Sequence, residues 1–331
     1  MRRRWRGIAI LLIAIATLSA CALTRSELTP AATAHLPARV ELAQVPFFAQ
    51  DDYQCGPAAL ATVLQSAGHD TTPDALTEEV FLPGRKGSLG VELLAATRMR
   101  NRVPYLLPET PVALLEELAA GRPVLVMQNL GLERLPAWHF AVLVGYDLDE
   151  QTMILRSGTA QRLVVGERRF MRTWERARRW AVVVLEPDRL PANPQLDRYI
   201  QAVASLEAVG KLDAAEQAYT RAHEHWPQSA WPVLGLANVR YAQGQLDAAD
   251  EAYRIALRID PNDIVAHNNL AEILLRRGCT AQARKHVEHA RIHAKGGALE
   301  AAVNKTARRV HDAEALHVQP SSSECPSPTS F

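Results

Sequence analysis

This sequence lacks the patterns that mark several large protein classes. Its four cysteines lie far apart and form no CxxC pair, so their spacing fits neither a common zinc site nor a disulfide framework. The 37 basic residues balance the 36 acidic residues, and no basic block indicates a nucleic-acid partner. No Walker A sequence is present. We therefore expect no metal, no cofactor and no nucleic acid.

The N-terminus carries an apolar run that is short for a membrane span. A basic segment precedes Ile8–Leu18, about eleven residues, which is too short to cross a bilayer comfortably. The run ends in Leu18-Ser19-Ala20-Cys21, which resembles the lipobox of bacterial lipoproteins. The resemblance implies a signal peptide over residues 1–20 and lipidation of Cys21. An uncleaved signal anchor is the alternative.

The residues after Cys21 extend this interpretation. Ala22 follows the cysteine, and the absence of an aspartate there resembles the pattern of lipoproteins sorted to the outer membrane. Residues 21–40 contain Pro, Thr and Ser and are expected to tether a folded domain to the lipid. We therefore expect an outer-membrane lipoprotein that faces the periplasm.

A cysteine stands where a helix is expected to begin. Cys55 is followed by Gly56 and Pro57, and proline suits the first turn because its missing N–H would have no partner there. Apolar residues continue at helical spacing to about Ser66. The unpaired N–H groups of a helix N-terminus favour a thiolate. Cys55 is therefore a candidate nucleophile, with a small buried packing residue as the alternative.

Residues 41–190 change from helical patterns to strand patterns, which predicts an α+β domain with a largely antiparallel sheet. Helical patterns cover 73–80, 88–99, 111–120 and 170–178, and strand patterns cover 103–107, 123–127, 137–146, 152–155, 163–165 and 180–185. His139 lies near the start of an apolar strand. A rigidly held imidazole can act as a general base near neutral pH, although a lone histidine there is more often a packing residue.

Two separated segments resemble the bacteriocin-processing, double-glycine leader peptidases, a family of papain-like cysteine peptidases. Val45-Pro46, Gln50 and Cys55–Leu60 are similar to its cysteine motif, and His139–Asp147 is similar to its histidine strand. The resemblance covers residues 44–186. It implies a papain-like fold that acts on a peptide or protein, with Cys55 as nucleophile and His139 as general base and acid.

The resemblance also implies a glutamine upstream of the cysteine that donates to the oxyanion. Gln50 is the candidate, although it lies one residue closer to the cysteine than is usual. Gln54, which directly precedes the cysteine, is the weaker candidate.

The third catalytic residue of the family is missing. The family usually carries Asp followed by Pro after the histidine strand, where this chain has Arg156-Ser157-Gly158. A guanidinium cannot accept the imidazole N–H, whereas the Ser157 hydroxyl can, without bringing a charge. Asp147 and Asp149 are expected to face solvent in a turn. Two outcomes stay open: a Cys–His dyad oriented by Ser157, or a decayed site.

A repeat of 34 residues follows the break at Leu190–Pro194. Gly210–Ala215 recurs as Gly244–Ala249, with small residues and a closing proline that resemble tetratricopeptide repeats. We expect an all-α solenoid over residues 196–312 that binds a partner protein. Its three units are about 196–229, 230–263 and 264–297, and candidate contact residues are Asn238, Tyr241, His267, Asn268 and Asn269.

The C-terminal residues 313–331 lack apolar periodicity and are expected to be disordered. Cys279 is expected to be structural, and Cys325, in this tail, is expected to be incidental.

Taken together, these features predict a lipid-anchored cysteine peptidase joined to a recruiting repeat module. A catalytically decayed adaptor that only binds proteins is one rival. A thiol amidase or transglutaminase-like acyltransferase is another, because it would use the same nucleophile and base.

Overall fold

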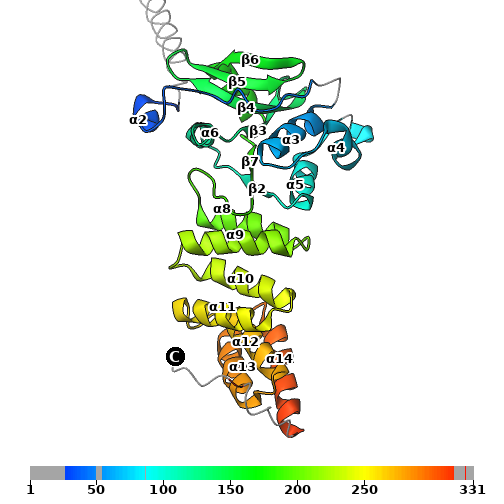
Figure 1. Cartoon of the computed structure of the whole chain (residues 1–331), viewed down its shortest axis with the longest axis vertical. Helices are drawn as coiled ribbons and strands as arrows, with labels where there is room; N and C mark the ends of the chain where they lie inside the picture. Colours follow the sequence, from blue (N-terminus) through cyan, green and yellow to red (C-terminus); the bar gives the residue numbers. More distant parts are fainter. Residues whose placement is uncertain (1–26, 50–53, 86, 317–324, 326–331) are drawn as a thin grey trace, which may run out of the picture.

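The computed structural model describes residues 27–49, 54–85, 87–316 and 325. The chain forms a column, with a sheet domain at one end and a stack of helices below it (Figure 1). The expected signal peptide, Cys21 and Gln50 lie outside the described residues. Within the described ranges, no helix combines the length and apolar character that a membrane crossing requires.

An antiparallel sheet forms the centre of the first domain. Its strand order is β2-β7-β3-β4-β5-β6, and β1 pairs with β4 outside this path. This arrangement, together with the helices that follow, confirms the predicted fold class of an α+β domain before a helical repeat region. The strands are β1 (Arg39–Glu41), β2 (Val103–Leu106), β3 (Val124–Asn129), β4 (Trp138–Asp147), β5 (Thr152–Ser157), β6 (Ala160–Gly166) and β7 (Ala181–Leu185).

Helices cover both faces of this sheet. One face, lined by Phe140, Val142 and Val144, packs against α3 and its neighbours, and the opposite face packs against α6 and α7. These helices are α3 (Cys55–Ser66), α4 (Pro73–Val80), α5 (Gly90–Met99), α6 (Pro111–Ala119) and α7 (Glu167–Glu175), with short turns α2 (Pro30–Thr33) and η1 (Pro83–Arg85) beside them.

One predicted helix is displaced. The pattern placed a helix at 170–178, but α7 runs from Glu167 to Glu175. Arg178 and Arg179 take positive φ angles of 55° and 52°, which no helix interior tolerates. The chain turns there and returns as β7.

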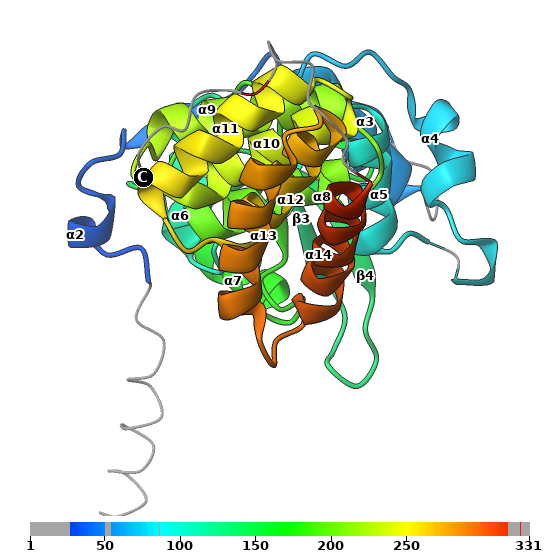
Figure 2. The same ribbon diagram turned by 90° about the horizontal axis from the view of Figure 1, so that it is seen from below.

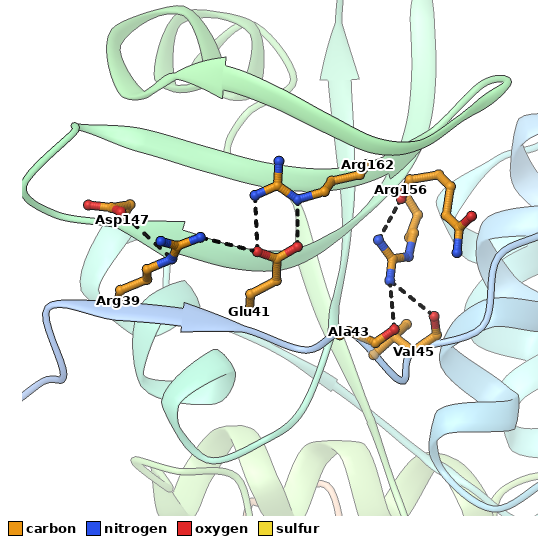
Figure 3. Close-up of polar contacts among 8 residues, drawn as sticks. Arg39, Glu41, Ala43, Val45, Asp147, Arg156 and Arg162 are labelled. Atoms are coloured by element: carbon orange, nitrogen blue, oxygen red, sulfur yellow. Dashed lines mark hydrogen bonds and ion pairs between the residues drawn. The ribbon is translucent and has the colours of Figure 1, made fainter.

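The segment before α3 lies close against the sheet. A Cβ at Gly145 of β4 would lie 2.4 Å from the carbonyl oxygen of Val40 in β1, so only glycine lets the two strands approach. Beyond β1, the guanidinium of Arg156 donates to the carbonyl oxygens of Ala43 and Val45 at 3.2 and 3.3 Å (Figure 3). These contacts fix the lead-in to α3 against the sheet.

Seven helices follow the sheet domain in the described part of the chain, and the first two share its core. Tyr105 of β2 and Tyr199 of α8 have ring centroids 6.3 Å apart, within one cluster of buried residues. The buried Glu117 of α6 accepts the backbone N–H of Ala192 at 2.7 Å. The helices are α8 (Leu196–Glu207), α9 (Leu212–His225), α10 (Ala230–Ala242), α11 (Leu246–Ile259), α12 (Ile264–Arg276), α13 (Thr280–Ala294) and α14 (Glu300–Ala315).

The C-terminal expectations need two corrections. Helix α14 runs to Ala315, so residues 313–315 are helical, because Val303, Thr306 and Val310 bury one face of α14 against the last repeat. Cys325 is not incidental: it forms a disulfide with Cys279, with the two Cα atoms 5.6 Å apart. Sequence spacing gave no sign of this pair because its partners are separated by 46 positions and meet only in the fold.

Candidate active site

The candidate nucleophile lies at the start of α3, packed against the sheet. Cys55 is the first residue of this helix, and its neighbour Gln54 occupies the N-cap without a side-chain cap bond. The sulfur is half-buried and packs against the cluster that includes Phe140 of β4. Backbone groups of Phe140 and Gly56 lie close enough to act on the pKa of the thiol. Phe140 directly follows His139 on the strand, so the start of α3 lies near the strand end that carries the candidate base.

The candidate base is held by the serine that replaces the family's aspartate. His139 Nε2 and Ser157 Oγ lie 2.8 Å apart, joining the start of β4 to the end of β5. With Nε2 engaged, Nδ1 is the ring nitrogen that remains for the thiol. No hydrogen bond joins the Cys55 sulfur to the imidazole in the described structure.

The site favours the neutral forms of both groups. Burial raises the pKa of the Cys55 thiol, and these backbone groups oppose this effect without cancelling it. Burial also lowers the pKa of His139. Burial therefore opposes the thiolate that the helix N-terminus is expected to favour.

Neither aspartate that follows β4 can orient His139. Asp147 lies eight residues along the strand, roughly 26 Å away at about 3.3 Å per residue. It accepts the backbone N–H groups of Asp149 and Glu150 at 3.1 and 3.0 Å. Its other neighbour is Arg39, which also approaches Glu41 (Figure 3).

Arg156 has a structural role, because its guanidinium donates to backbone carbonyl oxygens. The side chain is buried, and its remaining contact is with the carbonyl oxygen of Gln161 at 2.5 Å. Its partners are backbone carbonyls on both sides of β5, so it ties β6 and the lead-in segment together (Figure 3).

Sequence reasoning missed a second row of polar residues beside the histidine. Gln128 of β3 is the cross-strand partner of His139, and its Nε2 donates to Thr173 Oγ1 of α7 at 2.6 Å. Both side chains are buried. The available signal was a Gln-Asn pair that closes an otherwise apolar strand at residues 128–129.

The candidate contact residues of the repeats also make contacts within the repeats. Asn238 accepts hydrogen bonds from Tyr253 at 2.7 Å and from Asn269 at 3.2 Å. His267 lies 2.9 Å from His286, and Asn268 donates to Asn269. These contacts support the packing interpretation of the repeat residues, while Tyr241 lies 4.9 Å beneath the guanidinium of Arg276.

No set of three or more His, Cys, Asp or Glu side chains in the described ranges is arranged to hold a metal.

Comparison with known families agrees with this geometry. Residues 42–182 match the model of the Peptidase_C39 like family. Residues 206–255 and 237–278 match models of the tetratricopeptide repeat. The N-terminal α+β domain thus matches the C39-like peptidase model, and the helices after it match tetratricopeptide repeats. The match spans Cys55, His139 and Ser157 but does not establish activity.

Individual relatives are distant. Cellulose synthase 1 operon protein C of Komagataeibacter xylinus is 34% identical over 112 residues, which are 30% of this chain and only 8% of that protein. A C39-like peptidase from Bacillus anthracis is 18% identical and covers 44% of this chain and 97% of its own, with a TM-score of 0.37. The chaperone SycD of Yersinia enterocolitica, solved with a peptide of the translocator YopD, is 20% identical over 37% of this chain and 94% of its own, with a TM-score of 0.35.

The pKa directions predict how Cys55 reacts with a small alkylating reagent. Because the raised pKa keeps the thiol protonated, modification by iodoacetamide is expected to be slow at pH 7 and to rise with a midpoint above about 8.5. The site of modification is read by mass spectrometry, with Cys55→Ala as the control. A rate that stays flat from about pH 5 to pH 8 would instead indicate a preformed thiolate–imidazolium pair.

Proposed function

We propose that this protein is a cysteine peptidase anchored to the bacterial cell envelope, with repeats that recruit a protein partner. One observation carries the catalytic part. The 2.8 Å contact with Ser157 fixes His139, and Cys55 packs against the cluster that includes Phe140, the residue after His139 on β4. A candidate nucleophile on α3 and a candidate base on β4, from distant parts of the chain, therefore lie near the same end of β4.

The proposed reaction begins with a neutral pair. The Cys55 sulfur attacks the peptide carbonyl carbon while His139 Nδ1 takes the thiol proton. The amine then leaves with that proton, and a thioester remains on Cys55. Water then attacks the thioester carbonyl carbon, and His139 accepts the water's proton. The Cys55 sulfur leaves and takes this proton from His139, which releases the carboxylic acid product. No co-reactant other than water is needed.

Ser157 is proposed to orient the imidazole, in the place of a carboxylate. Its hydroxyl can accept the Nε2–H of neutral His139, which selects the tautomer whose Nδ1 is free to take a proton. A serine adds no negative charge, so it stabilises the imidazolium less than an aspartate would. The proposed enzyme therefore relies on substrate binding to generate its nucleophile.

Gln50 is proposed as the oxyanion donor, from the family resemblance alone. Gln54 is the second candidate, and its place at the N-cap of α3 keeps it next to Cys55. A side-chain amide in this position would donate to the oxygen that becomes negative in the tetrahedral intermediate.

The chain's cysteines support a location outside the cytoplasm. The Cys279–Cys325 disulfide suits an oxidising compartment, because cytosolic thiols are usually kept reduced. The lipobox-like segment ending at Cys21 supports sorting to the outer membrane, with the folded domains facing the periplasm.

The first test of the proposal is loss of hydrolysis on removal of the thiol. We expect the purified full chain to hydrolyse a peptide from a random library and Cys55→Ala to abolish this. His139→Ala should reduce kcat at least about 100-fold, the usual scale of general base catalysis. Product peptides are measured by mass spectrometry. The double variant Cys279→Ser with Cys325→Ser is the matched control, because it removes two other sulfur atoms and should keep the hydrolysis.

A decayed adaptor is the second candidate, and it is favoured because the partner of His139 among the described residues is Ser157 and not a carboxylate. An adaptor would hydrolyse nothing, and Cys55→Ala would capture the same protein partners as the wild type. An acyltransferase would instead turn over only when an added amine accepts the acyl group.

The role of Ser157 makes a separate prediction. Ser157→Ala is expected to lower kcat by about tenfold, because the ring loses the acceptor that fixes its tautomer, while KM stays near the wild-type value. Ser157→Asn or Ser157→Asp should restore most of the rate, since both offer an acceptor. The kinetics are compared with those of Ser66→Ala, a hydroxyl loss on the same helix as Cys55. Equal loss in both serine variants would contradict the assignment.

Anchoring is tested through Cys21. The wild-type chain expressed in a Gram-negative host is expected to fractionate with outer membranes and to carry acyl mass on Cys21. Cys21→Ser should abolish the acylation and leave the chain uncleaved or soluble in the periplasm. An unacylated wild-type chain would contradict the lipoprotein proposal.

A further inference from the structure

The loop that joins β3 to β4 exposes a group of large apolar side chains directly before His139. Leu130, Leu132, Leu135 and Trp138 are 53%, 70%, 75% and 54% exposed. We call residues 130–138 the apolar hairpin. It projects from the body of the molecule (Figure 2). Single exposed apolar residues are ordinary, but a contiguous group of this kind marks a contact surface.

The apolar hairpin is a built structure. Leu132 and Leu135 exchange two backbone hydrogen bonds of 3.2 Å around a two-residue turn. The buried Asn129 side chain closes the base, accepting the N–H groups of Gly131 and Ala137 at 3.0 Å each. A Cβ at Gly131 would lie 2.4 Å from the carbonyl oxygen of Leu135, so this position requires glycine.

A second anchor comes from α7. Arg176 donates two hydrogen bonds to the carbonyl oxygen of Asn129, at 3.2 and 2.8 Å. The leucines are therefore presented on a braced element, and a ligand that binds them does not have to order the loop.

The strand register places the leucines beside the candidate base. Gln128 pairs with His139, and Leu132 pairs with Leu135. Paired residues, and residues two apart on one strand, lie on the same side of a ribbon. Leu130, Leu132 and Leu135 thus share the side of His139, and Trp138 lies on the other side of the same strand end.

We propose that the apolar hairpin is the substrate-binding element of this site. It would contact large aliphatic or aromatic side chains of a peptide whose scissile carbonyl lies at Cys55. This inference rests on the proposed peptidase function. It follows from continuity, because the hairpin leads directly into the strand that begins at Trp138 and carries His139 on the same side as the leucines.

The charges at the tip favour a peptide over a lipid surface. Glu133 and Arg134 form the exposed turn between Leu132 and Leu135. Insertion of the hairpin into a bilayer would bury both charges first, which is costly. A peptide can instead lie along the leucines while the charged turn stays in water.

The test measures binding separately from hydrolysis. The full chain carrying Cys55→Ala is titrated into two fluorescent peptides of equal length, one with Leu and Phe side chains and one with Ser and Asn in their place. Leu132→Ser with Leu135→Ser is expected to weaken binding of the apolar peptide by about tenfold, a typical loss for removal of interface anchors. Binding of the polar peptide is expected to be weak in both proteins.

Ile292→Ser is the matched control, because Ile292 on α13 is 73% exposed, like the two leucines, but lies in the repeats. It should leave binding of the apolar peptide unchanged. Equal affinity of the double variant and its parent would overturn the proposal. So would a double variant that loses binding to anionic phospholipid vesicles while it keeps peptide binding, since that result assigns the hairpin to the membrane.

Hydrolysis by the chain with Cys55 intact separates this inference from the proposed function. If Cys55→Ala binds the apolar peptide through the hairpin but the wild type cleaves no peptide, the binding surface stands and the peptidase proposal fails. If the wild type and Leu132→Ser with Leu135→Ser cleave apolar and polar peptides at equal rates, the peptidase proposal stands and the hairpin inference is overturned.

Discussion

The structure of the site depends on the packing of the start of α3 against β4. Cys55 lies against the buried cluster that includes Phe140, so this packing joins two segments separated by about eighty residues of sequence. Nine of the helix's twelve residues are buried, from Gly56 to Leu64, so the packing that fixes the helix also fixes the sulfur. Small residues in the first turns let the helix approach the sheet this closely.

The same packing sets the electrostatics of the site. Burial that positions Cys55 and His139 also disfavours their charged forms, so the pKa of the thiol rises and that of the imidazole falls. A carboxylate would oppose this by stabilising the imidazolium, and Ser157 holds the ring without doing so. The packing thus positions the thiol and the imidazole but does not favour their charged forms. A bound substrate would have to favour those forms.

The repeats continue the sheet domain directly. Tyr199 and Val203 of α8 share a core with Tyr105 of β2, and Glu117 holds the connecting segment through Ala192. In the connecting segment, Gln195 also donates its backbone N–H to the Tyr105 hydroxyl at 3.2 Å, so this segment is tied to the sheet domain at two points. The disulfide and α14 close the opposite end, where a repeat array would otherwise expose its apolar face.

The sequence by itself determined the element types, the two-part architecture and the C39-like and repeat character of the two parts. Periodicity and turn residues are local signals, so helix α3, the strands and the 34-residue repeat follow from them. It also indicated Ser157, because residue chemistry alone excludes Arg156 as an acceptor. Only the tertiary structure decided which groups are desolvated, that Cys279 meets Cys325, and that Gln128 and the apolar hairpin stand beside His139. Burial and pairing across many positions are properties of the packed chain, and no local pattern encodes them.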